Sequence, residues 1–279
     1  TTNLSSIYFL EQDYKQADEY ANMAVQHTRY NASALVNKGN CLFAADDLDG
    51  ARSVFLEAVG VQADCVEAIY NLGLVNVRIG QHDEARQAFE KLHSIIPNDP
   101  CVIYQIAATY EEQNNLDDAI KWLNVLITRV PNDAGVLSRL GQLLCEQEEE
   151  AHGLHYQLES YHAYPFDLDV ISWIGVRFVK QEMYEKSIEF FTQAARIQPN
   201  EVQWMLMISS CHKRMGEYSK AYEMYEAIHS EYPNNTECLQ YLVSICSYVG
   251  KPSIVFQQRL NSLQQNVEQP KLPEEGIEQ

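Results

Sequence analysis

The sequence predicts an all-α fold, an α-solenoid in which pairs of short helices stack one after another. Two observations predict it. Residues of the same kind recur every 34 positions, without an insertion or deletion over seven successive repeats. A period of this length is typical of architectures in which each unit buries its apolar face against the next. In addition, 46% of the 279 residues are hydrophobic and 21% are charged, which suits a folded chain.

Small residues occupy two of the recurring positions, 12 residues apart. The first position holds Ser5, Gly39, Gly73, Ala107, Gly141, Gly175 and Ser209. The second holds Ala17, Ala51, Ala85, Ala119, Gly153, Ser187 and Ala221. We expect the two positions to face each other where two antiparallel helices cross, because a larger side chain would hold the backbones apart.

Other recurring positions predict how each unit is packed and where its helices end. Four residues after the second small position stand Phe55, Phe89, Leu123, Gln157, Phe191 and Tyr225, which we expect to fill the space between units. A proline that ends the second helix stands at positions 97, 131, 165, 199 and 233. Between the two helices, Gly80, Gly216 and Gly250 share one position with Asn114, which predicts a left-handed turn there.

These positions together resemble the tetratricopeptide repeat, a helix–turn–helix unit of 34 residues. The resemblance implies a right-handed superhelix. We expect one continuous array over 1–265 in about seven to eight units: a partial unit 1–31, then 32–65, 66–99, 100–133, 134–167, 168–201, 202–235 and 236–265. Residues 266–279 are polar and contain proline, so we expect a flexible tail.

Unit 134–167 departs from the pattern, since Gly153 and Gln157 replace the usual alanine and aromatic residue. A glycine within a helix costs about 1 kcal/mol relative to alanine, so we expect this unit to be the softest or most irregular. The chain begins inside the pattern without a polar cap, and we therefore expect it to be part of a longer protein.

The charge of the chain narrows its range of partners. There are 20 Lys and Arg residues against 39 Asp and Glu, a formal net charge of −19. A field this negative opposes binding to nucleic acid and to anionic membranes, so a basic protein segment is the natural partner. No run approaches the roughly 18 apolar residues of a membrane span, and no signal peptide is evident. We expect a soluble, intracellular protein.

Enzymatic and metal-binding motifs are missing from the sequence. There is no phosphate-binding loop, dinucleotide motif or nucleophile elbow, so we expect no enzyme and no cofactor. The best metal candidates, His152, His155 and Glu159, are better explained as a solvated acidic face than as ligands. The seven cysteines include no C-x-x-C pair, which favours packing roles, and Cys211-His212 favours packing over a catalytic pair.

A binding surface is expected along the inner wall of the array, formed by the first helix of each unit. The inward positions favoured for partner binding are Tyr70, Leu74, Tyr104, Glu111, Gln142 and Leu206, with Ala108, Ser138 and Val176 beside them. Tyr70 and Tyr104 could equally pack between adjacent units. The positions that hold lysine and asparagine in a carboxylate clamp are Val36 and Asn40 here, followed by the two tyrosines, which disfavours that role.

Particular strings are similar to the C-terminal arrays of the polaris family of intraflagellar transport proteins, in register over residues 3–250. The most specific stretch is Ile197–Tyr218, because Trp204 and Cys211 are not explained by the general repeat. The other strings are NLSSIYFLEQDYKQADEYAN, RYNASALVNKGN, EAIYNLGLV, KLHSIIP, DVISWIG and ECLQYLV.

The resemblance implies a non-enzymatic scaffold subunit of intraflagellar transport complex B, required to build cilia and flagella. Its implied partners are other complex B subunits, notably the 52-kilodalton core subunit, and subunits of the core and peripheral subcomplexes. It implies a location in the cilium or flagellum, at the axoneme and ciliary base, and in the cytoplasm. Two alternatives remain: a general tetratricopeptide adaptor, such as a co-chaperone, and the regulatory arm of an enzyme.

Overall fold

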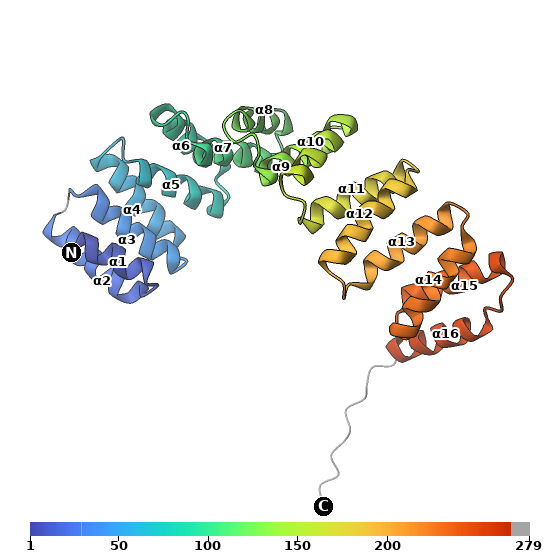
Figure 1. Ribbon diagram of the computed structural model, residues 1–279. Coiled ribbons are helices and arrows are strands. Elements are labelled where there is room, and N and C mark those ends of the chain that lie inside the picture. The colour runs from blue at the N-terminus through green and yellow to red at the C-terminus, as the bar shows by residue number, and fades with distance from the viewer. Residues whose placement is uncertain (29, 269–279) are drawn as a thin grey trace, which may run out of the picture. The chain divides into compact units, whose positions relative to one another are not determined.

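The computed structural model describes residues 1–28 and 30–268, which form 16 helices and no strand (Figure 1). The described residues divide into two compact units, with the division between Tyr156 and Gln157. The division falls inside α10 (Glu150–Ala163), within the unit that the sequence singles out as atypical. None of the described helices is both long and apolar enough to cross a membrane.

The all-helical prediction is confirmed in both units. The helices of the first unit are α1 (Thr2–Leu10), α2 (Tyr14–His27), α3 (Ala32–Ala44), α4 (Leu48–Val61), α5 (Val66–Ile79), α6 (His82–Ile95), α7 (Pro100–Glu112), α8 (Leu116–Ile127) and α9 (Ala134–Glu146). The second unit holds α11 (Leu168–Lys180), α12 (Tyr184–Ile197), α13 (Val202–Arg214), α14 (Tyr218–Glu231), α15 (Thr236–Val249) and α16 (Ile254–Glu268). Helix α16 thus includes residues 266–268 of the predicted tail, and 269–279 lie outside the described residues.

Short polar side chains begin most of these helices. Asp47 accepts a hydrogen bond from the backbone N–H of Gly50 at 3.0 Å, and Asp133 accepts one from Val136 at 3.0 Å. These bonds satisfy backbone donors that the first helical turn leaves unpaired. The start of most helices is therefore determined by residues close by in the sequence. Consecutive helices pack against each other within each unit.

The turns between paired helices adopt the left-handed conformation that the sequence predicts at Gly80, Asn114, Gly216 and Gly250. Four further residues take it at the same 34-residue interval, with φ between 61° and 66°: Gln12, Asp46, Glu148 and Glu182. Each turn is closed by a 6→1 backbone hydrogen bond, such as Gln81 N–H to Asn76 C=O at 2.8 Å. This is the Schellman arrangement of a helix C-terminus.

The two small positions face each other across each helix pair, as expected. Ser5 Oγ donates to the carbonyl oxygen of Ala17 at 2.8 Å, and Ser187 Oγ donates to that of Gly175 at 2.8 Å. Gly153 likewise lies where two helices approach each other closely. A β-carbon there would meet Cys145 and stand 2.7 Å from the carbonyl oxygen of Gly141, so close helix approach requires glycine.

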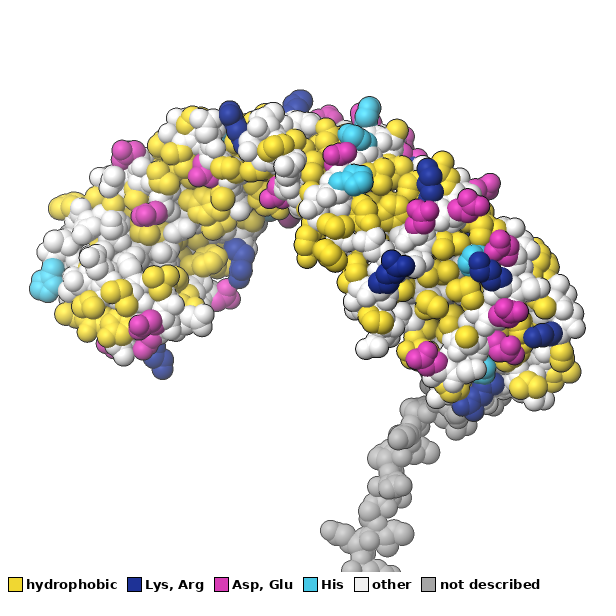
Figure 2. Space-filling view, viewed as in Figure 1, with side chains coloured by type: hydrophobic (Ala, Val, Ile, Leu, Met, Phe, Trp, Pro, Cys, Tyr) yellow, Lys and Arg dark blue, Asp and Glu magenta, His cyan; other side chains and the backbone are white. Residues whose placement is uncertain are grey.

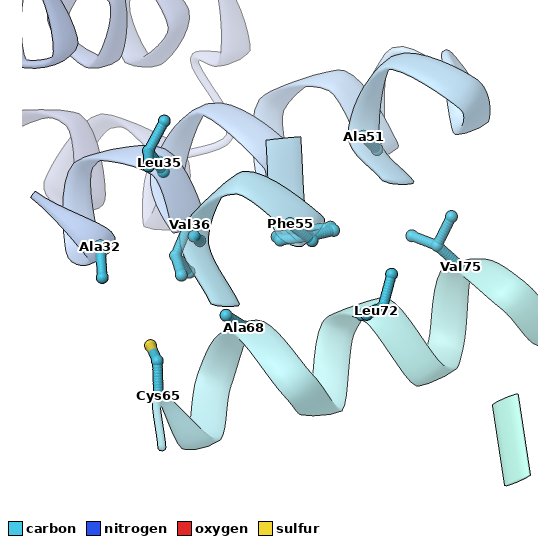
Figure 3. Close-up of a cluster of buried hydrophobic side chains, with 10 residues drawn as sticks. Ala32, Leu35, Val36, Ala51, Phe55, Cys65, Ala68, Leu72 and Val75 are labelled. Atoms are coloured by element: carbon cyan, nitrogen blue, oxygen red, sulfur yellow. The ribbon is translucent and has the colours of Figure 1, made fainter. Parts of the chain in front are cut away.

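The core is a series of apolar clusters that join one helix pair to the next. Figure 3 shows one of them, in which Phe55 from α4 lies between Val36 of α3 and Leu72 of α5. Equivalent clusters form around Phe89 in the first unit and around Phe191 in the second. This arrangement leaves the first helix of each pair with one face free of the core, and that face carries the candidate site.

Candidate functional site

The first unit has a hollow of about 670 Å³ along α1, α3 and α5. These are first helices of successive pairs, which is where the sequence places the binding surface. The lining residues are Thr2, Asn3, Ser6, Phe9, Leu10, Ser33, Val36, Asn37, Asn40, Val66, Glu67, Tyr70 and Asn71. They are mainly amides, hydroxyls and apolar side chains, and Glu67 is the one charged member.

Asparagine side chains connect the three helices across this hollow. Asn37 Nδ2 donates to the Ser6 hydroxyl at 2.9 Å and to the Thr2 carbonyl at 3.0 Å. Asn71 Nδ2 donates to Asn40 Oδ1 at 2.8 Å. A side-chain amide has two donor hydrogens and an acceptor oxygen. Asn40 Nδ2 and Asn71 Oδ1 form no hydrogen bond with the described residues, so the nitrogen can donate to a partner backbone and the oxygen can accept from one.

Two of the predicted site residues combine packing with exposure. Tyr70 is half-buried, its ring lies edge-on to Phe89 with centroids 5.8 Å apart, and it also lines the hollow. Its hydroxyl accepts a hydrogen bond from Gln105 at 3.4 Å. Leu74 is half-buried against the same cluster as Tyr70. Of the two alternatives left open for Tyr70, the structure therefore shows packing together with access to the hollow.

Tyr104, on α7, differs from Tyr70 because 44% of it is exposed. Glu111 and Gln142 are brought together by one cation. Arg139 forms an ion pair with Glu111, to which its Nε donates at 2.9 Å, and its Nη1 donates to Gln142 Oε1 at 2.8 Å. The positive charge of Arg139 is thus neutralised within the protein.

Leu206 lies in the second unit and is only 3% exposed. It packs in the cluster around Tyr225 and also lines a smaller hollow of about 160 Å³, together with Val176. The predicted site residues are therefore divided between the two units, and each unit has a hollow of its own.

The contacts and burial of the residues considered for metal binding and catalysis favour structural roles for them. His152 is exposed and lies 3.0 Å from Glu149, and the described residues contain no group of three His, Cys, Asp or Glu that could hold a metal ion. Cys211 and His212 are both buried; burial raises the pKa of the Cys211 thiol, and His212 Nδ1 lies 2.7 Å from a carboxylate oxygen of Glu217. A thiol with a raised pKa is protonated at neutral pH and is a poor nucleophile.

The asparagine network was not among the predicted site residues. Two of its members, Asn37 and Asn71, stand 34 residues apart, and Asn3, which lines the hollow, stands one interval earlier, so the repeat interval contained the signal. The prediction followed the small and apolar core positions, and a comparison of polar residues at the exposed positions would have found the network.

Comparisons with known proteins agree with this architecture. Three family models described as tetratricopeptide repeat match residues 42–100, 79–148 and 205–235. The chain is a tetratricopeptide repeat protein. Among curated proteins, the array is 26% identical over 117 residues to anaphase-promoting complex subunit 3 of Schizosaccharomyces pombe, a match that covers 42% of this chain. The array spans only 18% of the length of that relative.

Solved structures show the same fold at low sequence identity. The C-terminal part of a repeat-containing protein from Cytophaga hutchinsonii has a TM-score of 0.71 and 14% identity, and the match covers 86% of this chain and 98% of that one. YrrB, described as a tetratricopeptide protein with an unusual peptide-binding site, has a TM-score of 0.55 and 21% identity over 67% of this chain and 97% of its own. At these identities the likeness extends to the fold alone.

Proposed function

We propose that this array is a non-enzymatic scaffold subunit of intraflagellar transport complex B, and that the hollow of the first unit holds an extended segment of a neighbouring subunit. The observation that carries the binding proposal is the asparagine network along α1, α3 and α5. Amides that both donate and accept suit an extended backbone, which presents N–H and C=O groups in alternation. Val36 and Tyr70 supply apolar contacts beside them.

The charge of the hollow favours a neutral or basic segment. Its lining includes no Lys or Arg, and Glu67 adds a negative charge to a chain whose net charge is already −19. A partner carboxylate would therefore lose hydration without gaining a cation. The same argument disfavours capture of a C-terminal carboxylate, the role of chaperone-type clamps.

Sequence similarity to the polaris family supports the assignment to complex B. Trp204 and Cys211, the most specific residues of that similarity, are buried around Phe191. Because they are buried, these two residues support a core shared with that family. They do not indicate which residues contact a partner. In this proposal the partners are the 52-kilodalton core subunit and other complex B subunits of the core and peripheral subcomplexes. The protein would then act at the ciliary axoneme, at the ciliary base and in the cytoplasm.

A second candidate is a scaffold role in a different multiprotein assembly. The match to anaphase-promoting complex subunit 3 favours it, because that relative is named as a subunit of a complex. YrrB is described as having a peptide-binding site, which supports peptide capture as a general role for such arrays.

Purification of the tagged full-length protein from ciliated cells, read by mass spectrometry, tests the proposal. We expect complex B subunits in near-equal amounts, retained at high salt. The variant Asn40→Leu/Asn71→Leu should lose one neighbouring subunit, since it removes both members of the amide pair. The control Gln257→Leu/Asn261→Leu removes an exposed amide pair on α16 and should retain it. Predominance of another assembly would contradict the proposal.

A further inference from the structure

We infer that the second unit carries a separate binding site, one that accepts a partner segment in which an apolar side chain stands beside an aspartate or glutamate. The site is the hollow between α11, α13 and α15, with Arg214 at its edge. This site does not depend on the proposed role in complex B or on the asparagine network of the first unit.

The size and walls of the hollow define the first part of the ligand. It measures about 160 Å³, and its walls include the apolar side chains of Val176, Val179, Leu206 and Met207. A cavity of about 150 Å³ lined by apolar side chains holds a benzene molecule. The hollow therefore has room for one leucine-sized or aromatic side chain and is too small for a typical cofactor, which occupies about 300 Å³ or more.

Arg214 defines the second part. It is exposed at the last turn of α13, and it forms no ion pair or hydrogen bond with any residue that the structure describes. Three other arginines form ion pairs: Arg139 with Glu111, Arg78 with Asp46, and Arg86 with Glu90. Arg196, like Arg214, forms none with the described residues, but it does not line the hollow. In a chain with about twice as many acids as bases, a guanidinium left unpaired beside an apolar hollow is available to a carboxylate of a partner.

Neighbouring groups affect the field at this edge in opposite directions. Lys213 adds a second positive charge next to Arg214, and its ammonium group donates to the Ser244 hydroxyl at 2.7 Å. Glu237 also lines the hollow and is negative, but its carboxylate accepts a hydrogen bond from Tyr241 at 3.0 Å. Lys213 does not line the hollow, so the lining carries one guanidinium and one carboxylate, and Arg214 is the one of the two that has no bonded partner among the described residues. Figure 2 shows both basic and acidic side chains among hydrophobic ones on the visible face of this unit.

The geometry pairs the two parts of the ligand. An apolar side chain inserted into the hollow removes apolar surface from water, and an adjacent carboxylate can then meet the planar fork of Arg214 with two parallel hydrogen bonds. The first unit has no equivalent among its described residues at the larger hollow, whose lining contains no Lys or Arg. The hollow of the second unit therefore offers a partner carboxylate a guanidinium, which the hollow of the first unit does not.

A peptide array probed with the purified full chain tests this site. One set places Leu, Ile, Phe or Trp between Asp and Glu residues, and a matched set replaces the acids by Lys. We expect binding to the acidic set, and Arg214→Gln should weaken it about tenfold or more, since a charge-assisted pair is lost. Arg214→Glu should shift preference to the lysine set.

Arg196→Gln is the matched control, because Arg196 is an exposed arginine of the same unit that does not line the hollow. It should bind as the unaltered chain does, and all variants should keep the same helical circular dichroism. Failure of the chain to bind the acidic set, equal binding to both sets, or equal effects of Arg214→Gln and Arg196→Gln would overturn the inference. None of these outcomes bears on complex B purification, so the two proposals fail independently.

Discussion

The ring of Phe89 lies against the backbone of Gly73, so that a β-carbon on Gly73 would stand 2.5 Å from the ring. The same relationship joins Gly39 to Phe55 and Gly175 to Phe191, again at 2.5 Å. Where alanine takes the small position, at Ala107, the residue 16 positions later is Leu123. In these four units the size of the second residue follows the space that the first leaves open, whereas Ser209 is followed 16 positions later by the larger Tyr225.

Gly73→Ala should lower the free energy of unfolding by about 1–3 kcal/mol, since the added methyl group overpacks a tight contact. Phe89→Leu on its own should also destabilise, because it leaves a cavity. The double variant should lose less than the sum of the two, as the Ala107 and Leu123 pair implies. Urea unfolding followed by circular dichroism measures each change.

Gly60→Ala is the control for this series. Gly60 lies in α4, and a β-carbon there meets nothing within 4 Å. The substitution should raise stability by up to about 1 kcal/mol through helix propensity alone. Additive effects of Gly73→Ala and Phe89→Leu would refute the size relationship.

The repeat interval made most of the fold predictable. Residues 34 positions apart indicated the helix pairs, and Gly80, Gly216 and Gly250 indicated left-handed turns. Glu148 and Glu182 gave no such indication, because glutamate has no preference for that conformation and is forced into it by the turn. The turn geometry is therefore set by how the two helices pack, and glycine only makes it easier.

Glu182→Gly should raise the free energy of unfolding by about 0.5–1 kcal/mol, because glycine adopts φ near 61° without steric strain. Glu189→Gly, which removes an exposed glutamate from the interior of α12, should instead lower it by about 1 kcal/mol. Thermal unfolding of both variants at one pH separates the effect of the turn from the effect of losing a charge. A loss of stability in both would show that Glu182 makes a contact worth more than the strain.

Tyr225→Phe should leave stability unchanged or raise it by up to about 1 kcal/mol. Tyr225 is fully buried, and its hydroxyl interacts with the Ser210 side chain without forming a hydrogen bond of ordinary geometry, so its desolvation is poorly compensated. Tyr222→Phe is the contrasting variant, since the Tyr222 hydroxyl donates to Glu226 at 3.0 Å. Its loss should cost about 1 kcal/mol. A larger loss for Tyr225→Phe than for Tyr222→Phe would mean that the Tyr225 hydroxyl is bonded.

The candidate site was less predictable than the fold. The sequence placed Tyr70 and Leu74 on the inner helices, but it could not show that Glu111 and Gln142 both bind Arg139. Such pairings depend on rotamers and on the spacing of neighbouring helices, which a single sequence does not specify. Leu206 looked like a surface residue, because the helices that bury it follow it in the chain and their packing could not be predicted from the sequence.

Tyr70 and Tyr104 should respond differently to truncation, and this difference tests whether the inner face of the first unit binds a partner. Tyr104→Ala removes a ring that is 44% exposed, so it should leave the free energy of unfolding within about 0.5 kcal/mol. Tyr70→Ala removes the edge-on contact with Phe89 and should destabilise by about 2–4 kcal/mol. Binding of a neighbouring subunit, measured by calorimetry on the folded fraction, should weaken in both variants. If Tyr104→Ala keeps full affinity and full stability, then Tyr104 has no part in the binding surface, which would be restricted to the hollow along α1, α3 and α5.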